Sequence, residues 1–343
     1  MSKRQKKGQR NHMSSPVGLD VGTANLVGAK IKDKNVEVKR LRNAFLEIDL
    51  EQRSHLAKSN LSTVEIKNRH YIVGDEAIKM ARIFGKPVRR PMASGVLNPE
   101  EREGRDIVGA LVKALIGEGN GEKCCFSIPA NPVDNSKANN IWHTGFFTDL
   151  IEDLGYTAEP VNESLAIIYA ECGDDDHSGI AISHGAGQCN VTASYKLVGS
   201  LNFSICRGGD WIDEMTASSV GVSIARVMKV KEDPNFDLRD ASAFYEDSIG
   251  PALESYYKAL IRYELSHLVQ QWQKMKSQLD FPDAIPIVLS GGTASLKGFK
   301  ELWEDELKRF AKKNPLPFQV KEVRMAKDPL GAVARGLLTY ALI

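Results

Sequence analysis

Two apolar segments of the chain lead into glycine turns of the kind that hold phosphate groups. In the first, at residues 17–25, Asp20 places a carboxylate on a predicted strand and Gly22-Thr23 makes a tight turn before the next strand. Glycine lets backbone N–H groups approach a ligand closely, and an acid beside such donors can hold a hydrated Mg²⁺ that offsets phosphate charge. On its own, this pattern also describes an ordinary β-hairpin.

The same design returns in the second half of the chain. An apolar run ends at Ser183, a glycine turn covers residues 185–188, and an alternating strand follows. A third turn, Gly291-Gly292, comes after a buried apolar strand at residues 285–290. A duplicated α/β fold produces such a recurrence, so we expect the two hairpins to face one another across a cleft.

The segments that would position these turns alternate between short strands and helices. Residues 33–74 hold short predicted strands separated by charged turns, and a buried strand at residues 124–129 ends at Pro129. Residues 161–164 form a strand-to-helix corner that carries Glu163. The predicted helical parts are residues 75 onward, 101–118, 165–170, 216–283 with a polar break at 231–240, and the end of the chain from 332.

The composition is that of an ordinary globular protein. The 343 residues are 42% hydrophobic and 26% charged, and 45 Lys and Arg against 44 Asp and Glu leave a net charge of +1. This balance argues against a binder of polyanions, so we expect no nucleic-acid partner. No apolar run is long enough for a membrane span, and five cysteines without CxxC spacing favour neither zinc nor a disulfide framework. We therefore expect a cytoplasmic protein.

Residues 1–16 contain several basic side chains, no acid and no apolar periodicity. One interpretation is a disordered, solvated basic tail. The other is electrostatic attraction to an anionic surface, which would associate the protein with a membrane directly or through a membrane-protein adaptor.

Taken together and in order, these motifs resemble the actin-like ATPase superfamily of actin, sugar kinases and DnaK-type chaperones. Within it, they are most similar to the bacterial actins MreB and MamK. The first phosphate motif, residues 20–25, has the Gly-Thr-Ala-Asn form of MreB, and residues 289–298 resemble the adenosine motif. Further similar segments are residues 73–77, 90–97, 128–129, 162–166, 183–188, 207–213 and 328–330.

The resemblance implies a duplicated actin-like (ribonuclease H-like) α/β fold. Two lobes, each with an outer subdomain, would surround a central nucleotide cleft that binds ATP with Mg²⁺. The adenine would lie near Gly291-Gly292, and the protein would associate with itself in head-to-tail protofilaments. The residues that the resemblance assigns to the cofactor are Gly22, Thr23, Ala24, Asn25, Gly185, Ala186, Gly187, Gln188, Gly208, Gly209, Asp210, Gly291, Gly292 and Thr293.

The resemblance also predicts how the chain is divided. The core of lobe I would take residues 17–32, 75–160 and 318–343, with a small β-rich outer subdomain at 33–74. The core of lobe II would take residues 161–207 and 262–317, with a helical outer subdomain at 208–261.

The second phosphate motif departs from the family pattern at its first residue. The family has an Asp there, whereas this chain has Ser183. A serine can hydrogen-bond a hydrated Mg²⁺ but brings no charge, so we assign the metal to Asp20 through water and only weakly to Ser183. The next residue, His184, is either a packed or exposed histidine or a compensating cation that faces the phosphate.

The catalytic candidates are Asp134, Glu163 and Asp20. Asp134 stands where the MreB pattern has a Glu that positions the attacking water, but it could equally cap a helix at residues 136–140. Glu163 either lines the cleft or caps its own helix. With these departures, we predict retained nucleotide binding and slow or absent ATP hydrolysis.

Three functions remain open from the sequence. The favoured one is an ATP-dependent actin-like filament that acts as a cytoskeletal scaffold for cell shape or for organelle and cargo positioning. The alternative is a non-polymerising, nucleotide-binding pseudo-ATPase adaptor of the same fold. A small-molecule kinase would need an acid that deprotonates a hydroxyl group, and residues 130–140 offer only Asp134.

Overall fold

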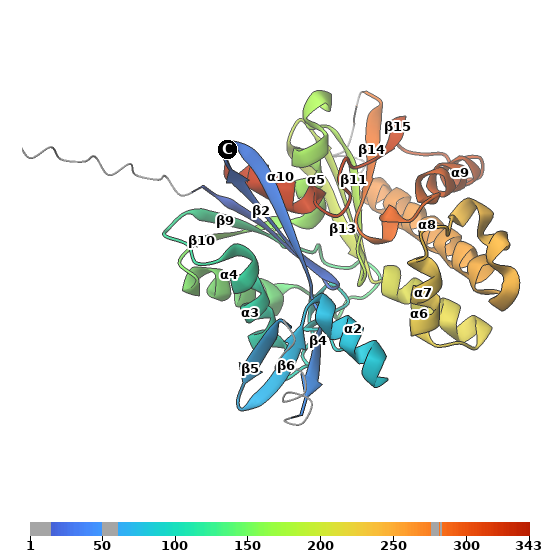
Figure 1. The fold of residues 1–343 in the computed structure, drawn as a ribbon. Coiled ribbons are helices and arrows are strands. Elements are labelled where there is room, and N and C mark those ends of the chain that lie inside the picture. The colour runs from blue at the N-terminus through green and yellow to red at the C-terminus, as the bar shows by residue number, and fades with distance from the viewer. Residues whose placement is uncertain (1–14, 50–60, 276–280, 282) are drawn as a thin grey trace, which may run out of the picture.

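The computed structural model describes residues 15–49, 61–275, 281 and 283–343. Most of the predicted basic tail, residues 1–14, therefore lies outside the described part of the chain. Two five-stranded sheets dominate the fold, and they have matching topology (Figure 1). The first has the order β10-β9-β1-β2-β3, and the second has the order β13-β12-β11-β14-β15.

Each sheet is an antiparallel meander extended by two parallel strands. In the first sheet, the meander is β1 (Val17–Val21), β2 (Asn25–Lys32) and β3 (Asn35–Arg42), and the parallel strands are β9 (Lys123–Ile128) and β10 (Thr157–Asn162). In the second, the meander is β11 (Gly179–His184), β12 (Cys189–Tyr195) and β13 (Val198–Ile205), followed by β14 (Ile285–Ser290) and β15 (Val320–Met325). The predicted duplication is confirmed.

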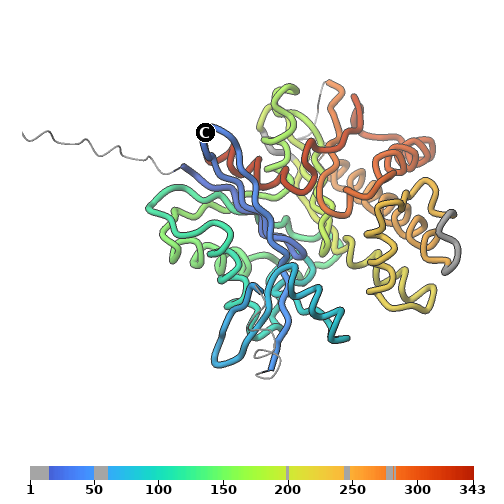
Figure 2. The backbone as a smooth tube through the Cα atoms, viewed as in Figure 1, coloured from blue at the N-terminus to red at the C-terminus, as the bar shows by residue number. Residues whose placement is uncertain are grey.

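Two helices lie between the sheets and join the lobes. They are α5 (Glu163–Glu171) and α10 (Ala332–Ala341), and their apolar faces share a core with buried residues of both sheets. The two helices are in close contact at Gly336, where an added Cβ would lie only 1.7 Å from the backbone oxygen of Ala166. Helix α10 also packs on β2, so the last helix lies beside the first strands of the chain (Figure 2).

The outer part of lobe I is a three-stranded sheet with one helix. Its strands are β4 (Phe45–Ile48), β5 (Thr63–Ile66) and β6 (Arg69–Val73), and the helix is α2 (Asp75–Phe84). The sequence analysis placed residues 33–42 in this subdomain, but β3 pairs with β2 along its whole length and belongs to the large sheet. The alternation of β3 predicts a strand but does not identify its partner. The remaining lobe I elements are β7 (Met92–Ala93), β8 (Val96–Leu97), α3 (Gly104–Ile116) and α4 (Ile141–Asp153).

The outer part of lobe II is helical. It contains α6 (Gly209–Val220), α7 (Ile224–Lys231), the 3₁₀ segment η2 (Leu238–Asp247) and the long helix α8 (Ile249–Lys274). The predicted boundary at residue 262 falls inside α8, which is one continuous helix of 26 residues. Helix α9 (Phe299–Ala311) packs beside it, and the short 3₁₀ segments η1 (Gly173–Asp175) and η3 (Thr293–Ser295) complete the described elements.

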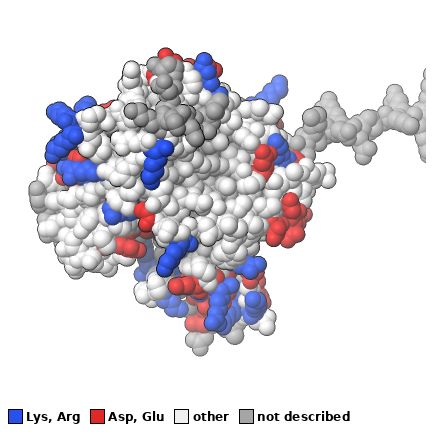
Figure 3. All heavy atoms as spheres, turned by 180° about the vertical axis from the view of Figure 1, so that it is seen from behind, with Lys and Arg blue, Asp and Glu red and all other residues white. Residues whose placement is uncertain are grey.

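Among the described helices, none has the length and apolarity needed to cross a membrane. On the face that Figure 3 shows, Lys and Arg side chains are interspersed with Asp and Glu.

Candidate nucleotide-binding site

A cavity of about 520 Å³ lies between the lobes and is lined by both phosphate-type turns. It contains most of the residues that the sequence analysis selected. Those that line it are Asp20, Gly22, Thr23, Ala24, Asn25, Glu163, Ser183, Gly185, Ala186, Gly209, Asp210, Gly291, Gly292 and Thr293. The predicted residues outside its lining are Asp134, Gly187, Gln188 and Gly208.

The first turn is held by its own backbone and by a neighbouring hairpin. The Gly22 N–H donates to the Asn25 carbonyl at 3.0 Å, and the Asn43 amide donates to the Gly22 carbonyl at 3.1 Å. Thr23 is almost fully buried, and its hydroxyl oxygen accepts the Gly95 N–H at 3.0 Å. Thr23 therefore joins the turn to the β7–β8 hairpin and keeps one hydroxyl hydrogen to donate.

The second turn closes in the same way and is supported from behind by α6. The Gly185 N–H donates to Gln188 at 3.0 Å, and the Gly185 carbonyl accepts from the Gly209 N–H and the Thr293 hydroxyl at 3.0 and 2.9 Å. A Cβ at Gly208 would lie 2.5 Å from the Ala186 oxygen, so this close approach requires glycine. Gly208 thus shapes the turn although it does not line the cavity.

The two turns meet at the tip of the β7–β8 hairpin. A Cβ at Gly187 would lie 2.4 Å from the Gly95 nitrogen and 2.7 Å from the Thr23 hydroxyl oxygen. Gln188 is buried against the same tip. Gly187 and Gln188 therefore lie where the lobes touch rather than on the cavity wall.

Asp20 lies in β1 beside the cavity and is supported by the next strand. Ser127, in the parallel strand β9, donates its hydroxyl to Asp20 Oδ1 at 2.9 Å and accepts the Val21 N–H at 2.7 Å. The surrounding protein removes solvent from the carboxylate and raises the pKa of Asp20 to about 6, although the Ser127 hydrogen bond opposes this shift. The sequence analysis did not select Ser127, although the parallel pairing of β1 and β9 would bring it here.

Glu163 faces the same space from the first turn of α5. Ser183 donates its hydroxyl to Glu163 Oε1 at 2.5 Å, and the Asn190 amide donates to Oε2 at 3.0 Å. The Asn162 side chain caps α5, so the alternative that Glu163 caps its own helix is wrong. Loss of solvent and the charge of Asp20 raise the pKa of Glu163 to about 8.

These groups fit a hydrated divalent cation. Asp20 and Glu163 supply two carboxylates, and each has its pKa raised because the surrounding protein leaves its negative charge poorly solvated. A bound cation would favour the ionised form of both acids, and oxygen ligands suit Mg²⁺. The Ser183 hydroxyl is already donated to Glu163.

Asp134 is held at the edge of lobe II rather than on the cavity wall. Its carboxylate accepts the Cys206 N–H at 3.0 Å and the Tyr263 hydroxyl at 3.1 Å. The predicted helix at residues 136–140 is absent from this described segment, because α4 begins at Ile141 with Asn140 as its N-cap residue. The N-cap interpretation of Asp134 is therefore wrong.

His184 also lies away from the cavity. Its side chain is fully buried and forms an ion pair with Glu264 of α8, with 2.8 Å between Nε2 and Oε2. Of the two interpretations from sequence, the packed histidine agrees with the structure, and a cation facing the phosphate does not.

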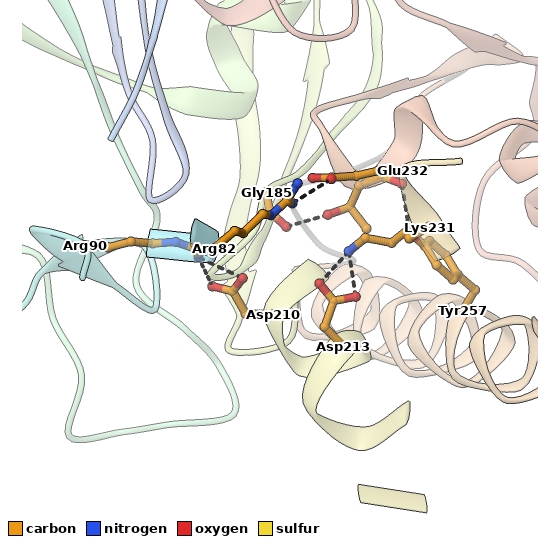
Figure 4. A network of polar contacts seen from close by, with 9 residues as sticks. Arg82, Arg90, Gly185, Asp210, Asp213, Lys231, Glu232 and Tyr257 are labelled. Atoms are coloured by element: carbon orange, nitrogen blue, oxygen red, sulfur yellow. Dashed lines mark hydrogen bonds and ion pairs between the residues drawn. The ribbon is translucent and has the colours of Figure 1, made fainter. Parts of the chain in front are cut away.

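Ionic contacts around the cavity mouth were not predicted from sequence. In lobe II, Lys231 Nζ donates to both carboxylate oxygens of Asp213 at 2.6 Å, and burial raises the pKa of Asp213 (Figure 4). Both residues line the cavity, as does Tyr257 of α8. Lys231 lies in the polar break between predicted helices, where sequence pattern alone gives no sign of a site.

Two further ion pairs cross from lobe I to lobe II. Arg90 donates to both oxygens of Asp210 at 2.9 Å, and Arg82 of α2 donates to Glu232 at 3.0 Å (Figure 4). All four residues also border a second cavity of about 950 Å³ between the outer subdomains.

Comparison with solved structures supports the same fold. The chain resembles a MamK double helical filament, with 18% identity, a TM-score of 0.65 and coverage of 96% of this chain and 98% of that one. A non-polymerising MamK mutant bound to AMPPNP gives 18% identity, a TM-score of 0.55 and coverage of 96% and 99%. The ethanolamine utilization protein EutJ from Carboxydothermus hydrogenoformans gives 16% identity, a TM-score of 0.55 and coverage of 96% of this chain and 92% of that one.

No curated protein matches the chain. The family model described as Volactin matches residues 15–341. The chain therefore belongs to the Volactin family, and its fold is that of the actin-like superfamily.

Proposed function

We propose that this protein binds ATP with Mg²⁺ between its lobes and assembles into nucleotide-dependent, head-to-tail filaments. The observation that carries the proposal is that the two phosphate-type turns and the Gly291–Thr293 corner line one cavity. Backbone N–H groups of both turns would bind phosphates, and the glycine corner would let the adenine lie close to the backbone. The similarity to a MamK filament supports the assembly part of the proposal.

When bound, Mg²⁺ would supply charge neutralisation to the phosphates. Asp20 and Glu163 would hold its water shell, since both acids border the cavity and each is fixed by a serine hydroxyl. Of the three catalytic candidates, these two are favoured over Asp134, whose carboxylate is engaged by Cys206 and Tyr263.

Hydrolysis is proposed to be slow. The residue that the resemblance assigns to positioning of the attacking water, Asp134, is held by Cys206 and Tyr263 outside the cavity lining. The Ser183 partner of Glu163 adds no negative charge that would strengthen cation binding. Positioning of water and charge neutralisation dominate phosphoryl transfer, so a weaker cation site slows the reaction.

The test is a sedimentation assay with ATP, GTP, ADP or no nucleotide, with phosphate release and electron microscopy read from the same samples. We expect pelleted filaments with ATP, few without nucleotide, and phosphate release that lags assembly. A protein that stays monomeric at high concentration with ATP and Mg²⁺ would exclude the filament.

The second candidate is a non-polymerising, nucleotide-binding adaptor, and Ser183 is the observation that favours it. A site that binds nucleotide without turning it over suits a protein that signals by closing its lobes. Calorimetric binding of ATP with no assembly in the same buffer would select this alternative. The cytoskeletal or cargo-positioning role, a cytoplasmic location and a membrane adaptor are further parts of the proposal that depend on the outcome.

A further inference from the structure

His184 directly follows Ser183, and its side chain points into the interior of lobe II. Successive side chains of a strand face opposite sides of the sheet, so Ser183 reaches Glu163 while His184 reaches α8. The imidazole packs edge-on against Phe299, with 4.9 Å between ring centroids, and Nδ1 lies 3.3 Å from the Ser290 carbonyl oxygen. The other carboxylate oxygen of Glu264, Oε1, accepts a hydrogen bond from Trp303 of α9 at 3.1 Å.

These contacts define where the hydrogens lie. A backbone carbonyl only accepts hydrogen bonds, so the contact with Ser290 is a hydrogen bond in the forms of His184 that carry a hydrogen on Nδ1. Nε2 and Glu264 Oε2 would then be two acceptors 2.8 Å apart, and neither has another hydrogen-bonding partner among the described residues. A hydrogen between these two atoms resolves the conflict and joins the two fully buried side chains.

His184 lies where the second turn, α6 and the Gly291-Gly292 turn converge. The backbone of His184 lies directly against the glycine corner, because a Cβ at Gly291 would lie 2.3 Å from the His184 oxygen. The next residue, Gly185, accepts hydrogen bonds from Gly209 and Thr293. His184 therefore directly precedes the point where the second turn meets α6 and the Gly291-Gly292 turn.

Helix α8 connects this pair to the cavity. Glu264 lies seven residues, or two helical turns, after Tyr257, so the two side chains share a face of the helix. Tyr257 lines the cavity, and its hydroxyl donates to the Thr293 carbonyl at 3.4 Å. The same helix thus contacts His184, at the start of the second turn, through Glu264, and it contacts the Gly291–Thr293 corner through Tyr257.

Stability does not explain such a pair. Replacing a buried ion pair with apolar side chains of similar volume is often neutral or stabilising, because the charges lose their hydration. Apolar side chains can pack in several orientations, whereas a hydrogen-bonded pair has a defined distance and angle. The pair would therefore restrict the position of the adjacent turn.

We propose that His184 and Glu264 are positioning residues for nucleotide binding, which hold the second phosphate turn in its binding geometry against α8 and α9. The inference rests on the proposed nucleotide function. Cys189 has its sulfur within 4.8 Å of the ligand atoms of both residues, so a metal ion in place of the proton is the competing explanation that the test must separate.

The central variant is the double replacement His184→Leu with Glu264→Leu. We expect an unfolding midpoint equal to or above that of the wild type and a dissociation constant for Mg-ATP raised about tenfold, whereas Glu264→Gln should stay within about twofold. The glutamine rescues the contact because its amide can donate to Nε2 while its carbonyl accepts from Trp303. A double variant that binds Mg-ATP as tightly as the wild type overturns the proposal.

The matched control is Arg262→Leu with Glu306→Leu. This pair involves α8 as well, and it joins α8 to α9 with 2.5 Å between Arg262 Nε and Glu306 Oε2, but it does not touch the turn. We expect it to change the unfolding midpoint without changing the affinity for Mg-ATP. If the control lost as much affinity for Mg-ATP, general destabilisation of α8 would explain both results, and the proposal would be overturned.

Hydrogen exchange tests the pair without relying on nucleotide or on a folded double variant. In the ligand-free protein, Glu264→Gln should leave exchange at residues 185–188 unchanged, while His184→Leu alone should accelerate it. Unchanged exchange in His184→Leu overturns the proposal, whereas a wild type that binds no nucleotide defeats only the proposed function. Stoichiometric zinc in the purified wild type, lost in Cys189→Ser, would show that a metal ion bridges the pair.

Discussion

Ser183 donates its hydroxyl to Glu163 Oε1 at 2.5 Å, so a residue at the end of β11 supports an acid of the same cleft. The contact joins β11 to the first turn of α5, two elements that belong to different parts of the duplicated fold. Asn190 completes it from β12. The negative charge near the proposed cation is therefore concentrated on Asp20 and Glu163.

An aspartate in place of Ser183 should make the stability of the protein depend more strongly on a bound cation. In Ser183→Asp, the new carboxylate would lie beside Glu163 and repel it, which lowers the unfolding temperature of the ligand-free protein. Added Mg²⁺ and ATP should recover more stability than in the wild type and should increase phosphate release. Ser183→Ala is the control, because it removes the hydrogen bond without adding charge. Equal stabilisation by Mg²⁺ in Ser183→Asp and the wild type would contradict this view of the site.

Asp20 should account for much of the cation dependence of binding. We expect Asp20→Ala to weaken Mg-ATP binding about 10–100-fold, which is the usual cost when a group that orients a metal's surroundings is lost. Affinity for ATP in the presence of a chelator should change much less, since the backbone N–H groups of the turns remain. Calorimetry with and without Mg²⁺ separates these effects. An Asp20→Ala protein that binds Mg-ATP as tightly as the wild type would refute the assignment.

The two cleft acids should make the ligand-free protein less stable as the pH rises. Both carry pKa values above their ordinary range, about 6 for Asp20 and about 8 for Glu163, so the folded state binds more protons than the unfolded state between about pH 4 and pH 8. The free energy of unfolding therefore falls across this window. Thermal unfolding in buffers from pH 5 to pH 8 measures the effect, at roughly 1–2 °C for each kcal/mol in a chain of this length.

Glu163→Gln is the variant that identifies the group responsible. It keeps an acceptor for Ser183 but cannot ionise, so its unfolding temperature should depend less on pH and exceed that of the wild type near pH 8. Mg²⁺ should flatten the wild-type profile in the same way. A profile that is equally steep in Glu163→Gln would place the responsible group elsewhere.

The sequence predicted the parts of this site that depend on local backbone chemistry. The turns at Gly22-Thr23, Gly185-Gln188 and Gly291-Gly292 are specified by glycine next to apolar strands, and the structure brings all three to one region. The duplicated two-lobe fold follows from the recurrence of that pattern.

What the sequence did not reveal depends on partners that are distant along the chain. Ser127 reaches Asp20 only because β9 pairs in parallel with β1, and Lys231 reaches Asp213 because α7 folds back along α6. Asp134 was expected at the cleft or at a helix terminus, but Cys206 and Tyr263 hold it elsewhere. Residue type and spacing do not identify such tertiary partners.

The ion pair between Arg90 and Asp210 should slow the opening of the cleft. It joins the lobes with two hydrogen bonds of 2.9 Å, and both side chains are about one-third exposed, at 29% and 34%. Arg90→Ala should therefore release bound nucleotide several times faster, which stopped-flow displacement of a fluorescent ATP analogue measures. The matched control is Arg82→Ala, since the Arg82–Glu232 pair also crosses the lobes but is 56% and 44% exposed. Exposed pairs contribute only about 0–1 kcal/mol, so this control should have little effect, and equal effects of both variants would contradict the argument.

The contact of α10 with α5 should be the least tolerant of added volume. A Cβ at Gly336 would lie 1.7 Å from the Ala166 backbone oxygen, and backbone cannot move aside as a flexible side chain can. Gly336→Ala should lower the free energy of unfolding by about 1–3 kcal/mol or more, although alanine is the better helix former. Gly145→Ala in α4 is the control, because a Cβ there meets nothing within 4 Å and alanine should stabilise that helix by up to about 1 kcal/mol. Urea unfolding of both variants gives the comparison, and a Gly336→Ala protein as stable as the wild type would show that the helices can separate without cost.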